Sequence, residues 1–385
     1  MGKPITTIED LRTLARKKVP RVFFDYVDSG SWTEATLRAN SADLAAITFW
    51  PRVVRDLRSR SLATVLAGQA ASMPVAIGPT GSAGMQHADG EILAAQAAEA
   101  AGVPYALSAV SICSIEDVAR HTQSPFWFQV HFMQDKAFVD RLIDRAAAAA
   151  CSALVVTLDI QLHAQRHSDI RNNRKAAMFT LTRLPQFLSR PGWCMQMLGT
   201  RRRNFGNIVG HVEGLTDVSE VASWAASQLS PCIEWDDLRR VRDRWKGRLI
   251  VKGVTHPDDA RAAVAIGADA LVVSNHGGRQ LDGALSTIRA LPHVLAAVGP
   301  DTEVLMDGGI RSGQDVLKAL AMGAKGVLIG RAHLYGLGAG GRQGVEQCLE
   351  IIRKELDLTM AMCGVSDIRQ VSPAILAPRT GSGAW

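Results

Sequence analysis

The apolar run Ala270–Val273 (ALVV) leads directly into the polar stretch Ser274–Asp282 (SNHGGRQLD). Four apolar residues without polar alternation are typical of a short strand that is buried on both faces of a parallel sheet. In the polar stretch, His276 could accept a proton near neutral pH, and Arg279 could bind a carboxylate through two hydrogen bonds. Taken alone, the stretch is equally consistent with a polar turn after a core strand.

The same rhythm of apolar run, turn and alanine-rich helix recurs from residue 73 onward. Eight runs predict strands, at Pro74–Ile77, Pro104–Leu107, Phe126–Val130, Ala153–Leu158, Leu249–Val251, Ala270–Val273, Glu303–Met306 and Gly326–Ile329. Helices are expected between them, for example at Gly90–Ala101, Ser114–Arg120, Ala137–Ala149, Asp258–Ile266 and Gln314–Ala321. This alternation predicts an α/β fold, a closed (β/α)8 TIM barrel. A doubly wound open sheet is the alternative, but no Gly-x-Gly-x-x-Gly follows an early strand.

The flanking segments extend the barrel without adding a second domain. Helices are expected at 6–17, where Thr6 and Glu9 have capping-box spacing, and from Val22 to near Gly30. We expect one domain over 1–385, with the barrel at about 73–345, a long insert at about 171–234 and C-terminal helices at about 342–370.

Bulk composition excludes several classes of protein. The six cysteines form no Cys-x-x-Cys pair, which favours a reducing compartment and argues against a disulfide framework or a metal site. The amino terminus has no signal-peptide pattern, and the longest apolar run, Ala146–Leu158, is too short to cross a bilayer. Nine Lys and Arg against one acid give residues 166–203 a charge of +8, whereas the whole chain carries +6. Because the basicity belongs to this one segment, nucleic-acid binding is not expected.

In TIM barrels the chemistry lies where each strand enters its following loop. At these points the sequence places glycine or polar residues after all eight strands: Pro79-Thr80-Gly81, Ser108, Gln129 with His131, Thr157 with Asp159, Lys252, Ser274 to Arg279, Asp307-Gly308-Gly309-Ile310-Arg311, and Gly330-Arg331. Their convergence on one rim predicts a functional site.

The last two of these loops predict an anion site. Glycines allow backbone amides to approach a ligand, and a helix that begins at Ser312-x-x-Asp315 would direct its positive end toward it. Arg311 and Arg331 would complete a phosphate site, although two ordinary turns with surface arginines are the alternative. A lysine at the end of an apolar strand, Lys252, needs a partner, either a ligand anion or Asp159 or Asp307.

Five motifs occur in a fixed order: Pro79–Gly81, Thr157-x-Asp159, Val251–Gly253, Ser274–Asp282 and Asp307–Arg311. Together they resemble the FMN-dependent L-2-hydroxy-acid dehydrogenase/oxidase family, over about residues 6–370. Leu107–Glu116 and Arg331–Leu337 are most similar to the membrane-bound L-lactate and mandelate dehydrogenases of that family.

The resemblance implies a role for each matching residue. His276 would be the base, Asp159 would stabilise its imidazolium form, and Arg279 and Arg166 would bind the substrate carboxylate with help from the Tyr26 hydroxyl. Lys252 would lie near N1 and O2 of the flavin of FMN. The other cofactor-binding residues would be Pro79, Thr80, Gly81, Ser108, Gln129, Thr157, Ser274, Asp307, Gly308, Gly309, Arg311, Gly330 and Arg331.

Three departures from the family pattern concern the substrate. His131 stands where the family has a tyrosine that touches the substrate, and Ile160–Gln165 lacks the usual proline and glycine. Val110 replaces a bulky aromatic of the short-chain oxidases, which leaves room for a larger substrate. The implied reaction is oxidation of an L-2-hydroxy acid, with L-lactate favoured over a mandelate-type substrate. A soluble oxidase that uses O2 and a non-catalytic, membrane-docked flavoprotein are the alternatives.

The insert interleaves arginines with Leu, Phe, Trp and Met, which suits contact with lipid headgroups. Residues of about 171–205 are therefore expected to attach the protein peripherally to the inner face of the cytoplasmic membrane. A plain surface loop or an oligomer contact is the alternative. The resemblance further implies a homo-oligomer, a homotetramer, that delivers electrons to a quinone or a cytochrome.

Overall fold

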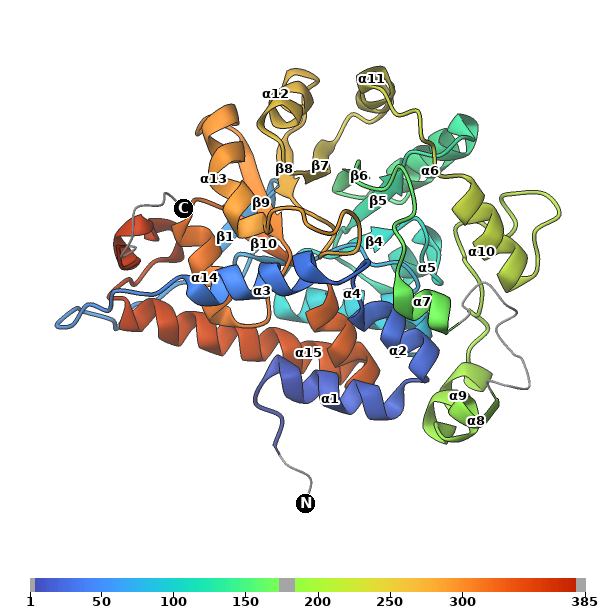
Figure 1. The fold of residues 1–385 in the computed structure, drawn as a ribbon, viewed down its shortest axis with the longest axis horizontal. Helices are drawn as coiled ribbons and strands as arrows, with labels where there is room; N and C mark the ends of the chain where they lie inside the picture. The colour runs from blue at the N-terminus through green and yellow to red at the C-terminus, as the bar shows by residue number, and fades with distance from the viewer. Residues whose placement is uncertain (1–3, 173–183, 379–385) are drawn as a thin grey trace.

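The computed structural model describes residues 4–172 and 184–378, and its centre is one eight-stranded parallel sheet (Figure 1). Neighbouring strands follow the order β3-β10-β9-β8-β7-β6-β5-β4. The strands are β3 (Val75–Ile77), β4 (Ala106–Ser108), β5 (Trp127–His131), β6 (Ala153–Thr157), β7 (Arg248–Val254), β8 (Ala270–Val273), β9 (Glu303–Asp307) and β10 (Gly326–Ile329). A parallel bridge between Ile77 and Tyr105 joins the two end strands. The predicted TIM barrel is therefore confirmed.

All eight predicted strands occur, and two of them have the predicted bounds. The largest difference is β7, which is longer at both ends and whose register against β8 shifts between Lys252 and Val254. The barrel helices are α4 (Gly90–Ala101), α5 (Ile115–His121), α6 (Lys136–Ala148), α11 (Trp235–Arg244), α12 (Pro257–Ala265), α13 (Thr287–Val298) and α14 (Gly313–Ala321). As predicted, the Ser312 hydroxyl caps α14 by accepting from the Asp315 amide at 3.1 Å.

A compact apolar layer fills the barrel interior. Its strand residues are Ala76, Ala106, Trp127, Ala153, Val155, Ile250, Ala270, Val272, Leu305 and Leu328, all with almost no exposed surface. Successive side chains of a strand alternate between its two faces. The residue two positions after the last apolar-layer residue of each strand therefore also faces inward. The apolar layer thus supports whatever lies at the carboxyl ends of the strands.

A hairpin that we did not predict covers the opposite end of the barrel. It consists of β1 (Thr64–Leu66) and β2 (Gln69–Ala71), and Leu66 belongs to the interior apolar cluster. A Cβ atom on Gly326 would lie 2.6 Å from the Leu66 Cδ2. The hairpin therefore packs against the amino end of β10 and closes that end of the barrel, whereas the carboxyl ends of the strands remain uncovered by it.

Three helices precede the barrel, α1 (Ile8–Lys18), α2 (Arg21–Asp28) and α3 (Ala35–Ala46). The predicted capping box of Thr6 and Glu9 was wrong by one position, because the reciprocal hydrogen bonds join Thr7 and Asp10. The α1 helix packs along α15 (Arg331–Met362), which runs across the lower part of Figure 1. Non-helical backbone at Gly340 and Gly341 divides α15, so its second part begins near the predicted residue 342.

The helix α7 (His167–Arg171) precedes the insert, which contributes α8 (Leu184–Leu188), α9 (Pro191–Gly199) and α10 (Val218–Ser227). Phe187 and Trp193 were expected on the membrane-contact surface, but both are buried and pack against Phe23, with ring centroids 6.3 and 5.4 Å away. That part of the prediction was wrong, because these rings attach the insert to α2. The exposed apolar side chains are instead Leu184, Leu188, Met195 and Leu198. Arg174, Lys175 and Arg183 of the basic segment lie outside the described residues.

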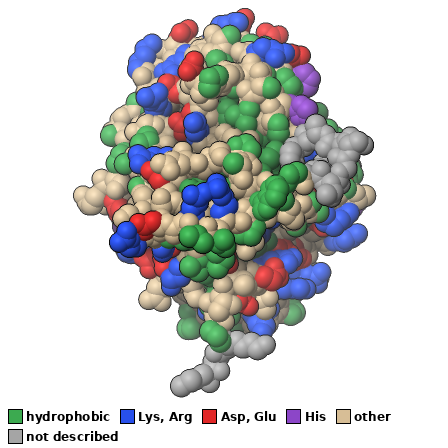
Figure 2. All heavy atoms as spheres, turned by 90° about the vertical axis from the view of Figure 1, so that its left-hand side faces the viewer, with side chains coloured by type: hydrophobic (Ala, Val, Ile, Leu, Met, Phe, Trp, Pro, Cys, Tyr) green, Lys and Arg blue, Asp and Glu red, His purple; other side chains and the backbone are tan. Residues whose placement is uncertain are grey.

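The segment of residues 51–60 extends between α3 and β1 at the left end of the molecule (Figure 1). Val53 and Val54 on it are 82% and 97% exposed. Figure 2 looks at this end, where hydrophobic side chains gather around basic ones. Within the described residues, none of the helices has the length and apolarity that a membrane span requires.

Candidate active site

A ring of buried polar side chains lies directly above the apolar layer, and we call it the polar layer. Strand alternation turns these residues inward, each two positions after a member of the apolar cluster. They are Ser108, Gln129, Thr157, Lys252, Ser274 and Asp307. Six strands thus bring together six of the residues that the sequence predicts to bind the cofactor.

Lys252 is the cation of the polar layer and only 4% exposed. Its Nζ lies 3.0 Å from the Asp307 Oδ2 and donates to the Ser274 Oγ at 2.8 Å. Burial alone would lower the pKa of Lys252, but Asp307 and Asp159 outweigh it, so the pKa is raised and the side chain is charged. The ion pair is the protein partner considered from the sequence, and Lys252 also lines the cavity described below.

His276 and Asp159 form a hydrogen-bonded pair, with the Nδ1 and Oδ1 atoms 3.0 Å apart. Burial lowers the pKa of His276, and the neighbouring carboxylate opposes this only partly. Burial would raise the pKa of Asp159, but the hydrogen bond with His276 and the charge of Lys252 keep it below its ordinary value. The pair is therefore a neutral imidazole beside a carboxylate, with Nε2 left to accept a proton.

The turn that carries His276 is held by residues that we did not predict. His276 has a φ of 58°, which a non-glycine residue adopts only where its surroundings enforce it. Asn275 supplies part of that constraint, since its Oδ1 accepts from the Gly278 amide at 3.1 Å. Asn275 also exchanges two side-chain hydrogen bonds, of 2.9 and 2.8 Å, with Asn40 of α3. Only tertiary structure brings Asn40 to this turn, so the sequence alone gave no signal for it.

Two guanidinium groups converge on the ring of Tyr26. The Arg279 Cζ lies 4.6 Å and the Arg166 Cζ 5.6 Å from the ring centroid. Burial, followed by repulsion from Arg166, lowers the pKa of Arg279 to about 9. The Arg279 Nη1 donates to the carbonyl oxygens of Tyr26 and Ser29, the latter at 3.1 Å. The Arg166 Nη1 lies 3.5 Å from the Asp169 Oδ2, so one of the two positive charges already has a protein partner, and the remaining charge favours a ligand anion.

Arg331 and Arg311 follow the last two strands but differ in their contacts. Arg331 is buried, and its Nε, Nη1 and Nη2 donate to the carbonyl oxygens of Val27, Gly277 and Ser29 at 2.8, 2.8 and 2.9 Å. Arg331 therefore braces the His276 turn as well as the cavity wall. The Arg311 Cζ lies 5.6 Å from the centroid of the Tyr335 ring, and Arg311 also lines the cavity described below.

A cavity of about 800 Å³, including its open mouth, joins these parts. Of the predicted residues it is lined by Tyr26, Pro79, Thr80, Gly81, Lys252, His276, Arg279, Asp307, Gly308, Gly309, Arg311, Gly330 and Arg331. The other predicted residues lie outside its wall: Ser108, Gln129, Thr157 and Ser274 in the polar layer, and His131, Asp159 and Arg166 on the side of β5 and β6. Gly277 and Ile310 belong to the predicted strand-end stretches, whereas we did not predict Val27, Gly78, Leu328 and Leu334, which are mostly apolar and carry no chemical signal in the sequence.

His131 ends β5 beside this constellation and is 9% exposed. Its buried Nδ1 has no hydrogen-bond partner within residues 4–172 and 184–378. Burial and then the charge of His276 lower the pKa of His131 to about 3, so the imidazole is neutral. The unusual turn Ile160–Gln165 follows β6, and the Gln280 Nε2 ties it down by donating to the carbonyl oxygens of Asp159 and Leu162 at 2.8 and 2.9 Å.

The family model described as FMN-dependent dehydrogenase matches residues 15–378. The chain belongs to the FMN-dependent dehydrogenase family. FMN is therefore its cofactor.

Individual relatives of this FMN-dependent dehydrogenase cover nearly its whole length. An L-lactate dehydrogenase of Caulobacter sp. (strain K31) is 44% identical over 97% of this chain and 98% of that protein. Another, of Pseudomonas syringae pv. syringae (strain B728a), is 42% identical with the same coverage. Among solved structures, the monotopic membrane protein (S)-mandelate dehydrogenase has a TM-score of 0.93 at 34% identity, covering 98% of this chain and 100% of that chain.

The polar layer and cavity of this FMN-dependent dehydrogenase fit the cofactor chemically. The Gln129 Oε1 accepts from the Ser108 hydroxyl at 3.0 Å, whereas the buried Gln129 Nε2 has no partner in the described part of the chain. The same is true of the Asp307 Oδ1. A free donor suits a carbonyl oxygen of the flavin, and a free acceptor suits a ribityl hydroxyl. At the other end, Gly330 caps the amino terminus of α15, where backbone amides favour phosphate.

Proposed function

We propose that this FMN-dependent dehydrogenase oxidises an L-2-hydroxy acid, with L-lactate as the favoured substrate, to the 2-oxo acid. The observation that carries the proposal is the arrangement at the rim of the cavity. The neutral His276 imidazole, paired with Asp159, lines the same cavity as Tyr26, on whose ring the guanidinium groups of Arg279 and Arg166 converge. A 2-hydroxy acid needs both parts, a base for its hydroxyl group and a cationic site for its carboxylate.

Substrate binding is assigned to Arg279, Arg166 and Tyr26. A carboxylate between the two guanidinium groups would relieve their repulsion and return the pKa of Arg279 from about 9 toward its ordinary value. The buried Arg166 Nε has no hydrogen-bond partner among the residues that the structure describes, so it remains a donor for the ligand. Fixing the carboxylate at this place orients the hydroxyl-bearing carbon toward His276.

Proton transfer is assigned to His276. Its Nδ1 is hydrogen-bonded to Asp159, so Nε2 takes the proton of the substrate hydroxyl, and the carboxylate stabilises the imidazolium that results. Bound FMN supplies the two-electron acceptor of the reaction. Lys252 would lie near N1 and O2 of the bound flavin, where its positive charge would stabilise the negative charge that develops on reduction.

The remaining residues are assigned to holding FMN. Gln129, Thr157, Ser108 and Ser274 of the polar layer would border the pyrimidine part of the flavin, and Asp307 would hold the ribityl chain. The cavity wall at Pro79, Thr80 and Gly81 would lie against the ring system. Gly308, Gly309, Arg311, Gly330 and Arg331 would surround the phosphate.

The choice of substrate depends on His131 and Val110. L-lactate is favoured because full-length relatives at 42–44% identity are L-lactate dehydrogenases. A mandelate-type substrate is the alternative, since a similar solved structure is (S)-mandelate dehydrogenase and Val110 is small and only half-buried. Anaerobic bleaching of the bound flavin by a panel of L-2-hydroxy acids, in native protein and His131→Tyr, distinguishes them. Faster bleaching by L-mandelate than by L-lactate in the native protein would reject lactate.

The electron acceptor is proposed to be a quinone or a cytochrome. An oxygen-uptake assay tests the competing assignment as a soluble oxidase. Little oxygen consumption with substrate, together with rapid reduction of a soluble quinone analogue, is the expected result. Fast formation of peroxide would reject the proposal.

Peripheral attachment to the inner face of the cytoplasmic membrane is proposed for the insert of about residues 171–205. Its support is the exposed apolar group Leu184, Leu188, Met195 and Leu198, near the exposed Arg201. Sedimentation with anionic vesicles at low salt tests this, with Leu188→Glu/Leu198→Glu as the variant and Leu285→Glu, outside the insert, as the control. Native protein that stays in the supernatant would reject attachment.

We further propose that the chain acts as one domain and assembles into a homotetramer. The exposed Val53 and Val54 on the projecting segment of residues 51–60 support a contact between copies. Light scattering after size-exclusion chromatography should give a tetramer for the native protein and smaller species for Val53→Asp/Val54→Asp. A monomer in the native protein would reject the assembly.

A further inference from the structure

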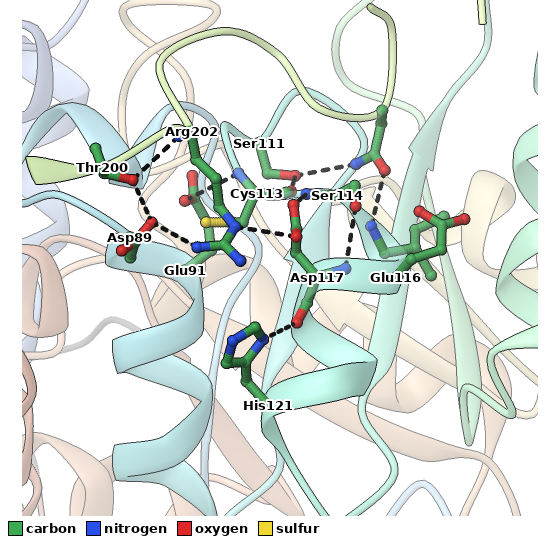
Figure 3. Close-up of polar contacts among 12 residues, drawn as sticks. Asp89, Glu91, Ser111, Cys113, Ser114, Glu116, Asp117, His121, Thr200 and Arg202 are labelled. Atoms are coloured by element: carbon green, nitrogen blue, oxygen red, sulfur yellow. Dashed lines mark hydrogen bonds and ion pairs between the residues drawn. The ribbon is translucent and has the colours of Figure 1, made fainter. Parts of the chain in front are cut away.

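The insert returns to the barrel through two neighbouring attachments beside the carboxyl end of β4. The first is Arg202, which lies between two carboxylates at the starts of α4 and α5 (Figure 3). Its Nη1 is 3.1 Å from the Asp89 Oδ1, and its Nε is 3.0 Å from the Asp117 Oδ1. The Thr200 hydroxyl strengthens this attachment by donating to Asp89 at 2.7 Å. Arg202 was expected to belong to the basic surface, but its ion pairs attach the insert to α4 and α5.

The second attachment is Asn207, whose side chain is completely buried. Its Oδ1 accepts from the Ile115 amide at 2.9 Å and from Arg145 at 3.2 Å. Its Nδ2 donates to the Ser111 hydroxyl at 3.0 Å and to the Ser108 carbonyl oxygen at 3.4 Å. The Asn207 amide group therefore uses both its ends to hold the turn between β4 and α5.

Gly206 allows this close approach. A Cβ atom at that position would lie 2.8 Å from the Ile112 carbonyl oxygen and 2.8 Å from the Ser114 nitrogen. The Gly206 amide donates to the same carbonyl oxygen at 3.1 Å. The insert backbone is thus pressed against the turn, which a side chain at residue 206 would prevent.

The turn held by Asn207 continues into the polar layer. The Ser108 hydroxyl donates to the Gln129 Oε1 at 3.0 Å, and the Ala109 amide donates to the Gln129 carbonyl oxygen at 2.8 Å. The hydrogen bond from Ser108 fixes which end of the Gln129 amide faces the serine. It thereby leaves Nε2 as the buried donor without a partner in the described chain.

We propose that Asn207 is a positioning residue of the flavin site, which it controls through Ser108 and Gln129. The inference rests on the proposed function, in which Gln129 donates to the pyrimidine edge of the flavin. It makes the insert a part of the cofactor site in addition to its proposed contact with the membrane. Arg202 attaches the same segment but holds no residue of the polar layer.

The test compares variants of the full-length protein by FMN affinity and by the reduction potential of the bound flavin. Asn207→Ala and Asn207→Asp both remove the donor to Ser111 and Ser108, and the aspartate keeps the acceptor for Ile115 and Arg145. Each should raise the Kd of FMN about tenfold, the effect of about one lost hydrogen bond. The reduction potential should become more negative, because a donor to the flavin favours the electron-rich form.

Two matched controls separate positioning from attachment. Asn204→Ala removes an asparagine of the same segment whose Nδ2 donates to the Thr216 carbonyl oxygen and whose Oδ1 accepts from the Phe205 amide. Arg202→Ala removes the ion pairs with Asp89 and Asp117. Both should leave the FMN affinity and the potential unchanged. An equal shift in Arg202→Ala would overturn the proposal, since loosening the insert would then suffice. Unchanged values in Asn207→Asp would overturn it as well.

Gln129→Ala separates this inference from the proposed function. A shift in Gln129→Ala with none in either Asn207 variant would refute the positioning role alone. No shift in Gln129→Ala would instead refute the assignment of Gln129 to FMN, on which the inference rests. Should Asn207→Ala fail to fold, Asn207→Asp and Ser111→Ala carry the same test.

Discussion

The polar layer differs from the substrate side of the site, which consists of Tyr26, His131, Arg166, His276 and Arg279 and is called the rim below. The two differ in how completely the protein itself pairs their charged groups. In the polar layer, Lys252 is paired with Asp307 and bonded to Ser274, and the sequence keeps the family motifs. At the rim, Arg166 and Arg279 crowd one ring, and the imidazole of His131 has an unused Nδ1 within the described residues. The difference is consistent with the proposed roles, in which the polar layer holds the cofactor and the rim binds the substrate.

The largest expected effect comes from replacing His276, the proposed general base. His276→Gln removes the proton acceptor but keeps a polar side chain, so the rate of flavin reduction should fall by about 10²–10⁴-fold. FMN should stay bound, because the polar layer is intact. Stopped-flow absorbance under anaerobic conditions measures the rate, and the visible spectrum reports the bound flavin. Reduction at the native rate would refute the assignment of the base.

Breaking the polar layer should instead reduce stability. Lys252→Met leaves the Asp307 carboxylate buried without its cation, a change that costs about 3–5 kcal/mol of unfolding free energy. Urea unfolding at a fixed FMN concentration measures it. Lys325→Met, at an exposed lysine, should change the unfolding free energy by less than about 0.5 kcal/mol. Similar values for both variants would contradict the role of the ion pair.

The same contrast explains what the sequence could and could not predict. Gln129, Lys252 and Asp307 were predicted because they are polar residues at the ends of apolar strands, and the family resemblance implied their role toward the cofactor. The hairpin of β1 and β2 was missed because its small residues, such as those of Gln69–Ala71, do not resemble a strand. The prediction that Phe187 and Trp193 lie on the surface was wrong, because composition does not reveal that both rings pack against Phe23.

Side chains that act across long chain separations were also beyond prediction. Asn207 lies 92 positions after Ile115, whose amide it accepts from, and nothing local distinguishes it from Asn204. The pairing of Lys252 with Asp307 was foreseen only as one of several options. Such pairings depend on the register of the strands, which only the folded barrel supplies.

A milder test of the rim changes the shape of its cation. Arg279→Lys keeps the charge but loses the planar pair of donors, so kcat/KM should fall by about 10–100-fold, mainly through KM. Steady-state kinetics with an artificial electron acceptor measure this. Arg289→Lys, at an exposed arginine of α13, is the control and should behave like the native protein. An unchanged KM in Arg279→Lys would remove Arg279 from the carboxylate site.

A further expected effect, to be measured between pH 7 and 5, is a pH dependence of stability at His131. Its pKa is lowered to about 3 in the folded protein, by burial and then by His276, from an ordinary value of 6.5. Below pH 6.5 the unfolded chain therefore binds a proton that the folded protein does not. This stability contribution is fully present above pH 6.5 and is lost at about 1.4 kcal/mol per pH unit on acidification toward pH 3.

His131→Phe should remove this contribution to the slope. Urea unfolding of native and variant protein at several pH values between 7 and 5 compares the two slopes. If the unfolding free energies of the two proteins had the same slope against pH, protonation of the buried His131 imidazole would not destabilise the fold, which would contradict the lowered pKa.

Anaerobic reduction of the FMN-loaded native protein by L-lactate and by D-lactate tests whether His276, Arg279 and Arg166 form the site that oxidises an L-2-hydroxy acid. The asymmetric arrangement of His276, Arg279 and Arg166 predicts complete bleaching of the flavin absorbance by the L-enantiomer and almost none by the D-enantiomer. Dithionite should bleach it in either case and serves as the control. A flavin that dithionite reduces but that no L-2-hydroxy acid reduces would contradict the account.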